Sequence, residues 1–535
     1  MQVVEITFSI IGGLALFMFA ITLLRETLGK MSGARVVRIL EKVSSNPING
    51  MAAGTATTFM TQSSSITVLT LIGFVNAGMM TFRQSVNIIL GSEIGTTVTA
   101  QLVSFDIGVA FWPLIAIGFF MSFFFKSEKV RLAGNVIFSL GLLFLAMDFM
   151  KEGAKPLTTE YPFFKDLIND YGAVPVFGIL IGALIAGVTQ SSSATTSLVI
   201  AMGAAGVIDL GPGIALVMGA NIGTCFLELF AAIGATTPAK RTAIAQALIN
   251  VIGVVIFLPF LGPFAAMSEA TAVELPRQLA NAHTIFNVIV SFIFIPLVGL
   301  LVRLCERIIP DKEGEIIGRY HFDEQMLNMP QAALLEAERE IIRTAELTLQ
   351  MIQHSRLALL ENETVDGDRV MVLEDEVDDR CRTTEEFIDK IREEELGEFD
   401  IIWRMKLLAV LTDVERVGDL SQNLAEFALH RFSNDVKFSE AAISDLGEMF
   451  EMVEETYSTS IEALRTRNKE LARVAVDLED EVDVLERKIR DAHNHRLREG
   501  ICMVEADTIF VETLRNLERI GDHADNIALD VIMKY

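Results

Sequence analysis

One polar pentapeptide occurs twice in the first half of the chain, and its residue types suit ligand binding. Gln and Ser side chains donate and accept hydrogen bonds without carrying a charge. Where they begin a half-helix, hydroxyls and free backbone N–H groups suit an anion, whereas unwound carbonyls and hydroxyl oxygens suit a small hard cation such as sodium. The pattern therefore predicts sites for an oxyanion and a cation. The two copies lie 128 residues apart and are Thr61-Gln62-Ser63-Ser64-Ser65 and Thr189-Gln190-Ser191-Ser192-Ser193.

A second motif repeats at the same offset, which indicates a duplicated unit rather than a chance match. We expect its glycines to allow a break in each helix, and Glu93, Thr96, Asn221 and Thr224 to contribute to the sites. For the two pentapeptides, the alternative is that Ser and Thr only let the hairpins pack closely, as small residues do between membrane helices. The two copies are Gly91-Ser92-Glu93-Ile94-Gly95-Thr96 and Gly219-Ala220-Asn221-Ile222-Gly223-Thr224.

Glu93 departs from the internal symmetry, because its counterpart in the second copy is the neutral Asn221. A carboxylate within a membrane segment is a functional candidate, here as a cation ligand or as a group that carries a proton. The alternative is a glutamate that is paired across helices or lies near the interface. Asp148 and Glu228 stand at the ends of apolar runs, where we expect interfacial rather than functional positions.

The elements that must position these residues are apolar segments. Seven runs are each close to the ~20 residues that cross a bilayer as a helix. Residues 1–309 balance 17 Lys and Arg against 16 Asp and Glu, so the net charge of −26 arises from residues 310–535. We therefore predict a membrane domain over 1–309. The runs are 6–24, 86–104, 108–125, 132–149, 212–234, 242–261 and 280–302.

Basic segments indicate which loops are cytoplasmic. Lys and Arg clusters at 25–42, 126–131 and 240–241 agree with one another only if each polar pentapeptide enters and leaves on one side of the membrane. We therefore expect re-entrant hairpins at 47–75 and 172–203, because broken backbone at membrane depth must be surrounded by protein or water. Three crossings then separate the first apolar run from its copy, which predicts two inverted-topology repeats. The repeats span about 10–100 and 138–228.

Residues 310–535 have apolar residues at three- and four-residue steps, which predicts long amphipathic helices. Acidic motifs recur at an offset of about 104 residues, so we expect two bundles of about three helices each, on the cytoplasmic side. Carboxylates four residues apart share a helical face, and two such faces would offer oxygen ligands to a hard divalent or iron-type cation. The candidates are Glu374, Asp378, Glu415, Asp419, Glu479, Asp483, Glu518 and Asp522.

The alternative for these carboxylates is a solvated acidic face that Arg416 and Arg519 neutralise. The sequence has no nucleophile and base constellation, no Gly-rich phosphate loop and no basic nucleic-acid patch. We therefore expect neither an enzyme nor a nucleic-acid-binding protein.

The duplicated Gln-Ser-Ser-Ser units with their Gly-Xaa-Asn-Ile-Gly-Thr elements resemble the sodium/phosphate cotransporter family, and residues 310–535 resemble a PhoU domain. The resemblance implies sodium-coupled movement of inorganic phosphate, with substrate and sodium bound by the two Gln-Ser-Ser-Ser hairpins together with Asn221 and Thr224. For the acidic motifs it implies phosphate signalling and metal clusters. Glu93 stands where the family usually has Asn, so the coupling ion and its stoichiometry stay open.

We therefore predict an all-α secondary transporter of phosphate in a bacterial inner membrane, with sodium as the coupling ion and a cytoplasmic PhoU-like domain that adjusts transport. One alternative is a membrane-anchored phosphate or metal sensor, and another is a transporter of sulfate or another oxyanion. Phosphate-signalling proteins and a second copy of the chain are candidate partners besides the lipid bilayer. The direction of transport and the oligomeric state stay open.

Overall fold

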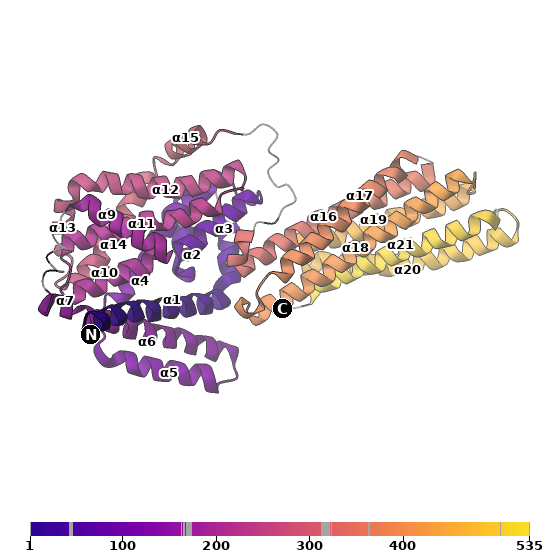
Figure 1. Cartoon of the computed structure of the whole chain (residues 1–535). Coiled ribbons are helices and arrows are strands. Elements are labelled where there is room, and N and C mark those ends of the chain that lie inside the picture. The colour runs from indigo at the N-terminus through magenta and orange to yellow at the C-terminus, as the bar shows by residue number, and fades with distance from the viewer. Residues whose placement is uncertain are drawn as a thin grey trace. The chain divides into compact units, whose positions relative to one another are not determined.

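The computed structural model is built almost entirely of helices. It describes residues 2–41, 46–161, 163, 166, 174–311, 322, 324–361, 364–502 and 504–533, and these contain no strand. The predicted all-α fold class is confirmed. The chain forms two compact units, Met1–Ala332 and Ala333–Tyr535, whereas the predicted boundary stands at 309/310 (Figure 1).

The first unit holds the helices of both sequence repeats and those that follow them. Their bounds are α1 Gln2–Glu41, α2 Pro47–Thr61, α3 Ser64–Asn76, α4 Phe82–Val103, η1 Gly108–Ala110, α5 Phe111–Phe124, α6 Glu128–Ala154, α7 Pro156–Thr159, α9 Pro175–Thr189, α10 Ser192–Ala204, α11 Leu210–Ala231, α12 Thr237–Phe257, η2 Leu258–Phe260, α13 Leu261–Glu269, α14 Leu275–Phe294, α15 Val298–Ile308 and η3 Glu324–Asn328.

Several of these helices are long and apolar enough to cross a membrane. Two bent pairs would add further spans: α4 and α5 meet at 110°, and α14 and α15 at 82°. The apolar run predicted at 280–302 is therefore not one straight helix, because it bends after Phe294. The unbent candidates within the described residues are Val4–Met31, Glu128–Thr159, Leu210–Ala231 and Thr237–Glu269.

Each polar pentapeptide interrupts a helix, as predicted. Gln62 follows α2 in the left-handed conformation with φ 51°, and the Ser63 hydroxyl caps α3 by accepting a hydrogen bond from the Ile66 N–H at 3.2 Å. The second copy has the same geometry, with φ 53° at Gln190 and Ser191 as the cap of α10. A left-handed residue ends one helix and a capping serine begins the next, so the pentapeptide itself specifies the break.

The predicted hairpins correspond to α2 with α3 and to α9 with α10. Residues 172 and 173 of the second predicted hairpin lie outside the described residues, as does Lys42 of the first basic segment. Each predicted hairpin is a helix, a break and a second helix within one compact unit, and its re-entrant path through the membrane stays a prediction.

The break predicted at the Gly-Xaa-Xaa-Ile-Gly-Thr motifs is wrong, because α4 and α11 run through them without interruption. The glycines instead allow close helix packing. A Cβ atom on Gly91 would lie 1.8 Å from the Met51 carbonyl oxygen of α2, and one on Gly219 would lie 2.0 Å from the Ile179 carbonyl oxygen of α9. A glycine that permits a bend also permits a neighbouring backbone to approach, and here the second property is used.

The helices around the two hairpins follow one plan. α2 packs on α4, and α9 packs on α11. α3 contacts both α4 and α11, and α10 contacts the same two helices. α12 packs against α3, α4 and α11, whereas α14 packs against α10, α11 and α4. Each serine-capped half-helix therefore lies between the glycine-motif helices of both repeats.

The second unit is an elongated helical bundle (Figure 1). α17 packs on α18, the helices α19, α20 and α21 pack on one another, and α18 packs on α21. The helices are α16 Pro330–Glu361, α17 Thr364–Asp389, η4 Glu393–Glu395, α18 Glu398–Ser433, α19 Glu440–Thr466, α20 Lys469–Arg498 and α21 Val504–Ile532.

The glycine contacts give a first prediction. Gly91→Ala or Gly219→Ala should lower the free energy of unfolding by about 1–3 kcal/mol, because a methyl group would have to displace a neighbouring backbone. Gly211→Ala is the matched control, since a Cβ atom on this residue of α11 meets nothing within 4 Å. Thermal unfolding in detergent would measure the effect. Equal unfolding midpoints in all three variants would contradict the packing role.

Candidate functional site

Hydroxyl and amide groups hold the first hairpin in place. Gln62 is buried, its Oε1 accepts a hydrogen bond from the Thr99 hydroxyl of α4 at 2.9 Å, and its Nε2 donates to the Phe59 carbonyl oxygen at 2.5 Å. The hydroxyls of Thr58 and Thr67 lie 3.0 Å apart across the break. The side chains of Gln62, Thr58 and Thr67 thus find hydrogen-bond partners within the protein, which an apolar surrounding favours.

The second hairpin has the same backbone but a different glutamine environment. The hydroxyls of Thr189 and Thr195 lie 3.4 Å apart across the break. Gln190 is exposed, and Leu227 occupies the position equivalent to Thr99, so α11 offers this glutamine no hydroxyl there. Among the described residues no hydrogen bond joins the two pentapeptides. Ser64, Ser65, Ser192 and Ser193 are buried, whereas Ser63 and Ser191 are half-buried caps.

Glu93 lies inside the protein on α4, with 6% of its surface exposed. Its Oε1 accepts hydrogen bonds from Gln246 Nε2 at 2.5 Å and from Asn250 Nδ2 at 3.4 Å. Both donors are neutral amides on α12, four residues apart and hence on one helical face. Glu93 is therefore buried inside the protein, and no basic side chain among the described residues pairs with it.

Asn221 occupies the equivalent place on α11, and its partners are on α14. Its Nδ2 donates to Asn287 Oδ1 at 2.9 Å, and its Oδ1 lies 3.3 Å from His283 Nε2. Thr96 and Thr224 use their hydroxyls on carbonyl oxygens of their own helices, at 3.0 and 3.1 Å. All four of these motif residues are buried. Glu93 contacts α12 and Asn221 contacts α14, and both of these helices lie outside the repeats.

Glu228 is more enclosed than its place at the end of an apolar run suggests. It was expected at the membrane interface, and in the structure none of its surface is exposed. α11 continues to Ala231 and packs against several helices, so the end of the apolar run in the sequence is not the end of the protein interior. Sequence reasoning also missed the polar pairs Gln246 with Asn250 and His283 with Asn287. Their four-residue spacing within apolar runs was the signal.

Two acidic motifs meet in the second unit, as the shared faces predicted. Carboxylate oxygens of Glu374 and Asp378 on α17 and of Asp419 on α18 all lie within 4.8 Å of one another. A Cβ atom on Gly418 would lie 3.3 Å from Val377, so a glycine allows the two helices to approach beside the carboxylates. Burial, and then the neighbouring carboxylates led by Asp378, raise the pKa of Glu374.

The second copy of the acidic motifs also gathers carboxylates on α20 and α21, but among the described residues only Glu374, Asp378 and Asp419 bring three ligand oxygens within 4.8 Å of one another. A Cβ atom on Gly521 would lie 3.2 Å from the Val482 side chain, as one on Gly418 would lie close to Val377. Burial, followed by the charges of Asp483, Asp525 and Asp522, raises the pKa of Glu479 to about 7. Burial and neighbouring carboxylates likewise raise the pKa of four further members of the two groups. These are Glu415, Asp419, Glu518 and Asp522.

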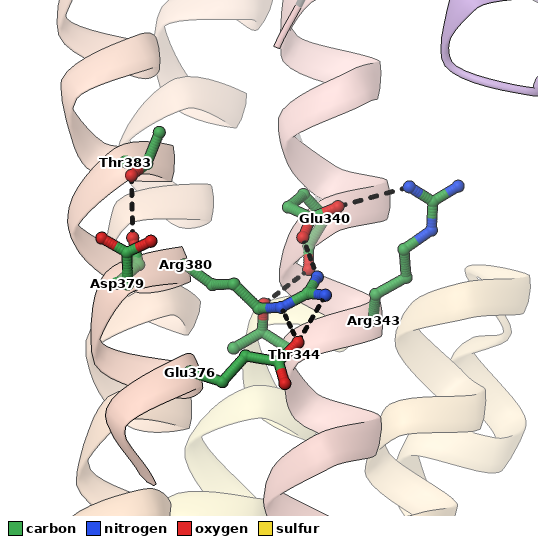
Figure 2. Close-up of polar contacts among 7 residues, drawn as sticks. All are labelled: Glu340, Arg343, Thr344, Glu376, Asp379, Arg380 and Thr383. Atoms are coloured by element: carbon green, nitrogen blue, oxygen red, sulfur yellow. Dashed lines mark hydrogen bonds and ion pairs between the residues drawn. The ribbon is translucent and has the colours of Figure 1, made fainter. Parts of the chain in front are cut away.

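An ion-pair network orients the acidic face of α17. Figure 2 shows Arg380 reaching Glu340 of α16 and Glu376, one turn away on its own helix. Arg343 also donates to Glu340, at 3.3 Å. Glu376 lies on the opposite side of α17 from the face that holds Glu374. The two residues are two positions apart in the sequence, and this spacing turns an α-helix by slightly more than half a turn. The network therefore holds one side of α17 while the carboxylate face remains turned towards α18.

Comparison with known proteins matches both halves of the chain. Residues 16–152 and 159–275 match the Na+/Pi-cotransporter family, and residues 341–428 and 446–531 match the PhoU domain. The chain belongs to the Na+/Pi-cotransporter family and carries a C-terminal PhoU domain. Family membership and the long apolar helices make it a membrane protein of a transporter family.

Relatives of this Na+/Pi-cotransporter family protein extend over its whole length or over one half. YjbB of Salmonella typhimurium, named as a candidate inorganic phosphate export protein, is 24% identical over 98% of this chain and 97% of its own. The PhoU homolog 1 of Thermotoga maritima is 30% identical over 35% of this chain and 86% of its own. The rat sodium-dependent phosphate transport protein 2A is 31% identical over 18% of this chain and 15% of its own.

Proposed function

We propose that this protein moves inorganic phosphate across a bacterial inner membrane, coupled to sodium, and that the two pentapeptide hairpins bind phosphate and sodium. The observation that carries the proposal is the pair of breaks at Gln62 and Gln190, each followed by a serine-capped half-helix. The free N–H groups of a helix start favour an anion, and hydroxyl oxygens favour a hard cation. The names of the full-length relative and of the rat relative agree with this substrate and this ion.

The arrangement of the helices supports transport by movement of one repeat against the other. Both serine-capped half-helices contact the same two helices, α4 and α11. A shift between the repeats would therefore change the surroundings of both hairpins together. We propose inverted-topology repeats on this basis, with access to the site alternating between the two sides of the membrane.

The segment that leads into the PhoU domain supports a regulatory role for that domain, which we place in the cytoplasm. η3 belongs to the first unit and packs against α3. Met326 fills the space beside Gly73, and the Thr70 hydroxyl lies 3.7 Å from the Met329 sulfur. The PhoU domain begins directly after this contact. A displacement of the domain would thus reach the first hairpin through the chain itself.

We propose that the acidic groups of the PhoU domain bind a hard divalent or iron-type cation. Glu374, Asp378 and Asp419 would hold it on one side of the internal duplication, and Glu479 with Asp483 on the other. Carboxylate oxygens are the ligands that such cations prefer. The raised pKa of Glu479 shows that the group is destabilised while it carries uncompensated charge, which a cation would relieve.

The hairpin proposal predicts the effect of single serine changes. Ser64→Ala and Ser192→Ala should each lower the initial rate of phosphate uptake into proteoliposomes about tenfold, because each removes one hydrogen bond to a charged ligand. Ser122→Ala on the exposed part of α5 is the matched control. Wild-type uptake by both site variants, at equal protein incorporation, would remove the hairpins from the site.

The acidic groups predict a dependence on pH. Glu479 has a pKa of about 7 in the folded protein, above its ordinary value of 4.5. Between these values the folded state holds an extra proton, so the metal-free domain should lose stability as pH rises from 4.5 to about 7. Above pH 7 the ionised carboxylate is free to bind metal, so Mn²⁺ should raise the unfolding midpoint more at about pH 8 than at about pH 6.

Trp403 allows this measurement in the full-length protein. The chain has 2 tryptophans, and Trp403 is buried in α18 of the second unit. In a Trp112→Phe background its fluorescence reports the unfolding of this unit. Glu479→Gln should flatten the pH dependence and reduce the Mn²⁺ effect, whereas Glu470→Gln, exposed on the same helix, should do neither. An Mn²⁺ effect that is equal at both pH values would contradict the proposal.

A further inference from the structure

A buried group of polar side chains, distinct from the one around Asn221, lies where the two repeats meet. It consists of Glu93 on α4, Glu228 on α11, Gln246 on α12 and Ser65 on α3. The two glutamates are close enough for their charges to interact, and the Ser65 side chain lies beside Glu228. Gln246 Nε2 donates to Glu93 Oε1 at 2.5 Å. One neighbourhood thus collects oxygen-bearing side chains from both repeats and from α12.

Three oxygens of this group are buried without a hydrogen-bond partner among the described residues. They are both carboxylate oxygens of Glu228 and Oε1 of Gln246. Glu228 has an exposed fraction of 0%. An unpaired buried acceptor costs about 1–3 kcal/mol, and more when it is charged. A carboxylate that keeps its charge in such a place needs donors or a cation beside it, and without them it takes up a proton.

No lysine or arginine of the described residues forms an ion pair with Glu93 or Glu228. The neighbouring helices α3, α9 and α10 contain no charged residue. Most other titratable groups of the helices packed around the pair are bonded elsewhere, stand near helix ends, or are exposed on α15. Those bonded elsewhere are Arg241 to Asp311, Arg277 to Ser104 and His283 to Asn221. Those near helix ends are Arg83, Lys240 and Glu269. The Cys225 thiol is the exception, because it lies close enough to interact with both glutamates.

The equivalent place in the other repeat serves as an internal comparison. Asn221 stands there instead of Glu93, and Ala100 stands instead of Glu228. Both polar atoms of the Asn221 side chain are hydrogen-bonded, to Asn287 and His283. The fold can therefore close this position with neutral groups. Two carboxylates, one from each repeat, therefore occupy only one of the two symmetry-related places.

We infer that Glu93, Glu228, Gln246 and Ser65 form a sodium site that links the two repeats. The ligands are carboxylate, amide and hydroxyl oxygens, which hard cations prefer. A proton would satisfy one of the unpaired oxygens, whereas a coordinated ion contacts several at once. The inference rests on the proposed function, because it assigns a coupling sodium to a site that shares only Ser65 with the first hairpin.

Such a site would make the contact between the repeats depend on sodium. Ser65 and Glu93 come from the first repeat and Glu228 from the second. With sodium bound, the two carboxylates attract one ion; without it, they repel each other in an apolar surrounding. Movement of one repeat against the other would then be coupled to binding and release of the ion.

The test is equilibrium binding of radioactive sodium to the full-length purified protein in choline buffer without phosphate. Glu228→Gln and Glu93→Asn should each weaken sodium binding about tenfold or more. Glu228→Ala serves as a second variant, since the symmetry-related position holds Ala100. Glu306→Gln, exposed on α15, is the control and should bind as the wild type.

Unchanged sodium affinity in monodisperse Glu228→Gln and Glu228→Ala protein would overturn the inference. Wild-type protein that binds no sodium, and whose unfolding midpoint responds to pH alone, would also overturn it by showing a proton in place of the ion. Because sodium binding is measured without transport, the proposed sodium site and the proposed transport function can be contradicted independently of each other. Glutamate-dependent sodium binding without phosphate transport would contradict only the proposed function.

Discussion

Helices that break inside an apolar interior must satisfy the backbone groups that they release. In this protein the requirement is met twice by one short sequence. A left-handed glutamine ends the first helix, a serine caps the next, and threonine hydroxyls bridge the gap. The surrounding helices then have to come close, and glycines in α4 and α11 allow their backbones to approach those of α2 and α9. The same polar groups that stabilise the breaks lie where a ligand would be bound.

Much of this architecture can be predicted from the sequence. The duplication, the helix breaks and the meeting of acidic faces follow from residue types at fixed spacing. The continuity of α4 and α11 does not, because Gly91 and Gly219 are equally compatible with a bend and with close packing. Only the position of the Met51 and Ile179 carbonyls decides between the two.

The burial of Glu228 shows the same limit. An apolar run in the sequence ends near it, yet the residue lies inside the protein because other helices cover that end of α11. Its proximity to Glu93 depends on how two repeats pack, which residue spacing along one chain does not give. The two hairpins have similar backbone geometry at the break, but the symmetry is broken in charge. That difference distinguishes the place where Glu93 and Glu228 meet from its symmetry-related counterpart.

The most direct test of the account is the flux of radiolabelled phosphate into proteoliposomes of the full-length protein. An inward sodium gradient is compared with an equal choline gradient, and unlabelled sulfate or phosphate is added as competitor. The account predicts flux that sodium stimulates, that unlabelled phosphate suppresses and that sulfate leaves unchanged. Flux that is equal in choline, or no flux from monodisperse protein, would contradict it.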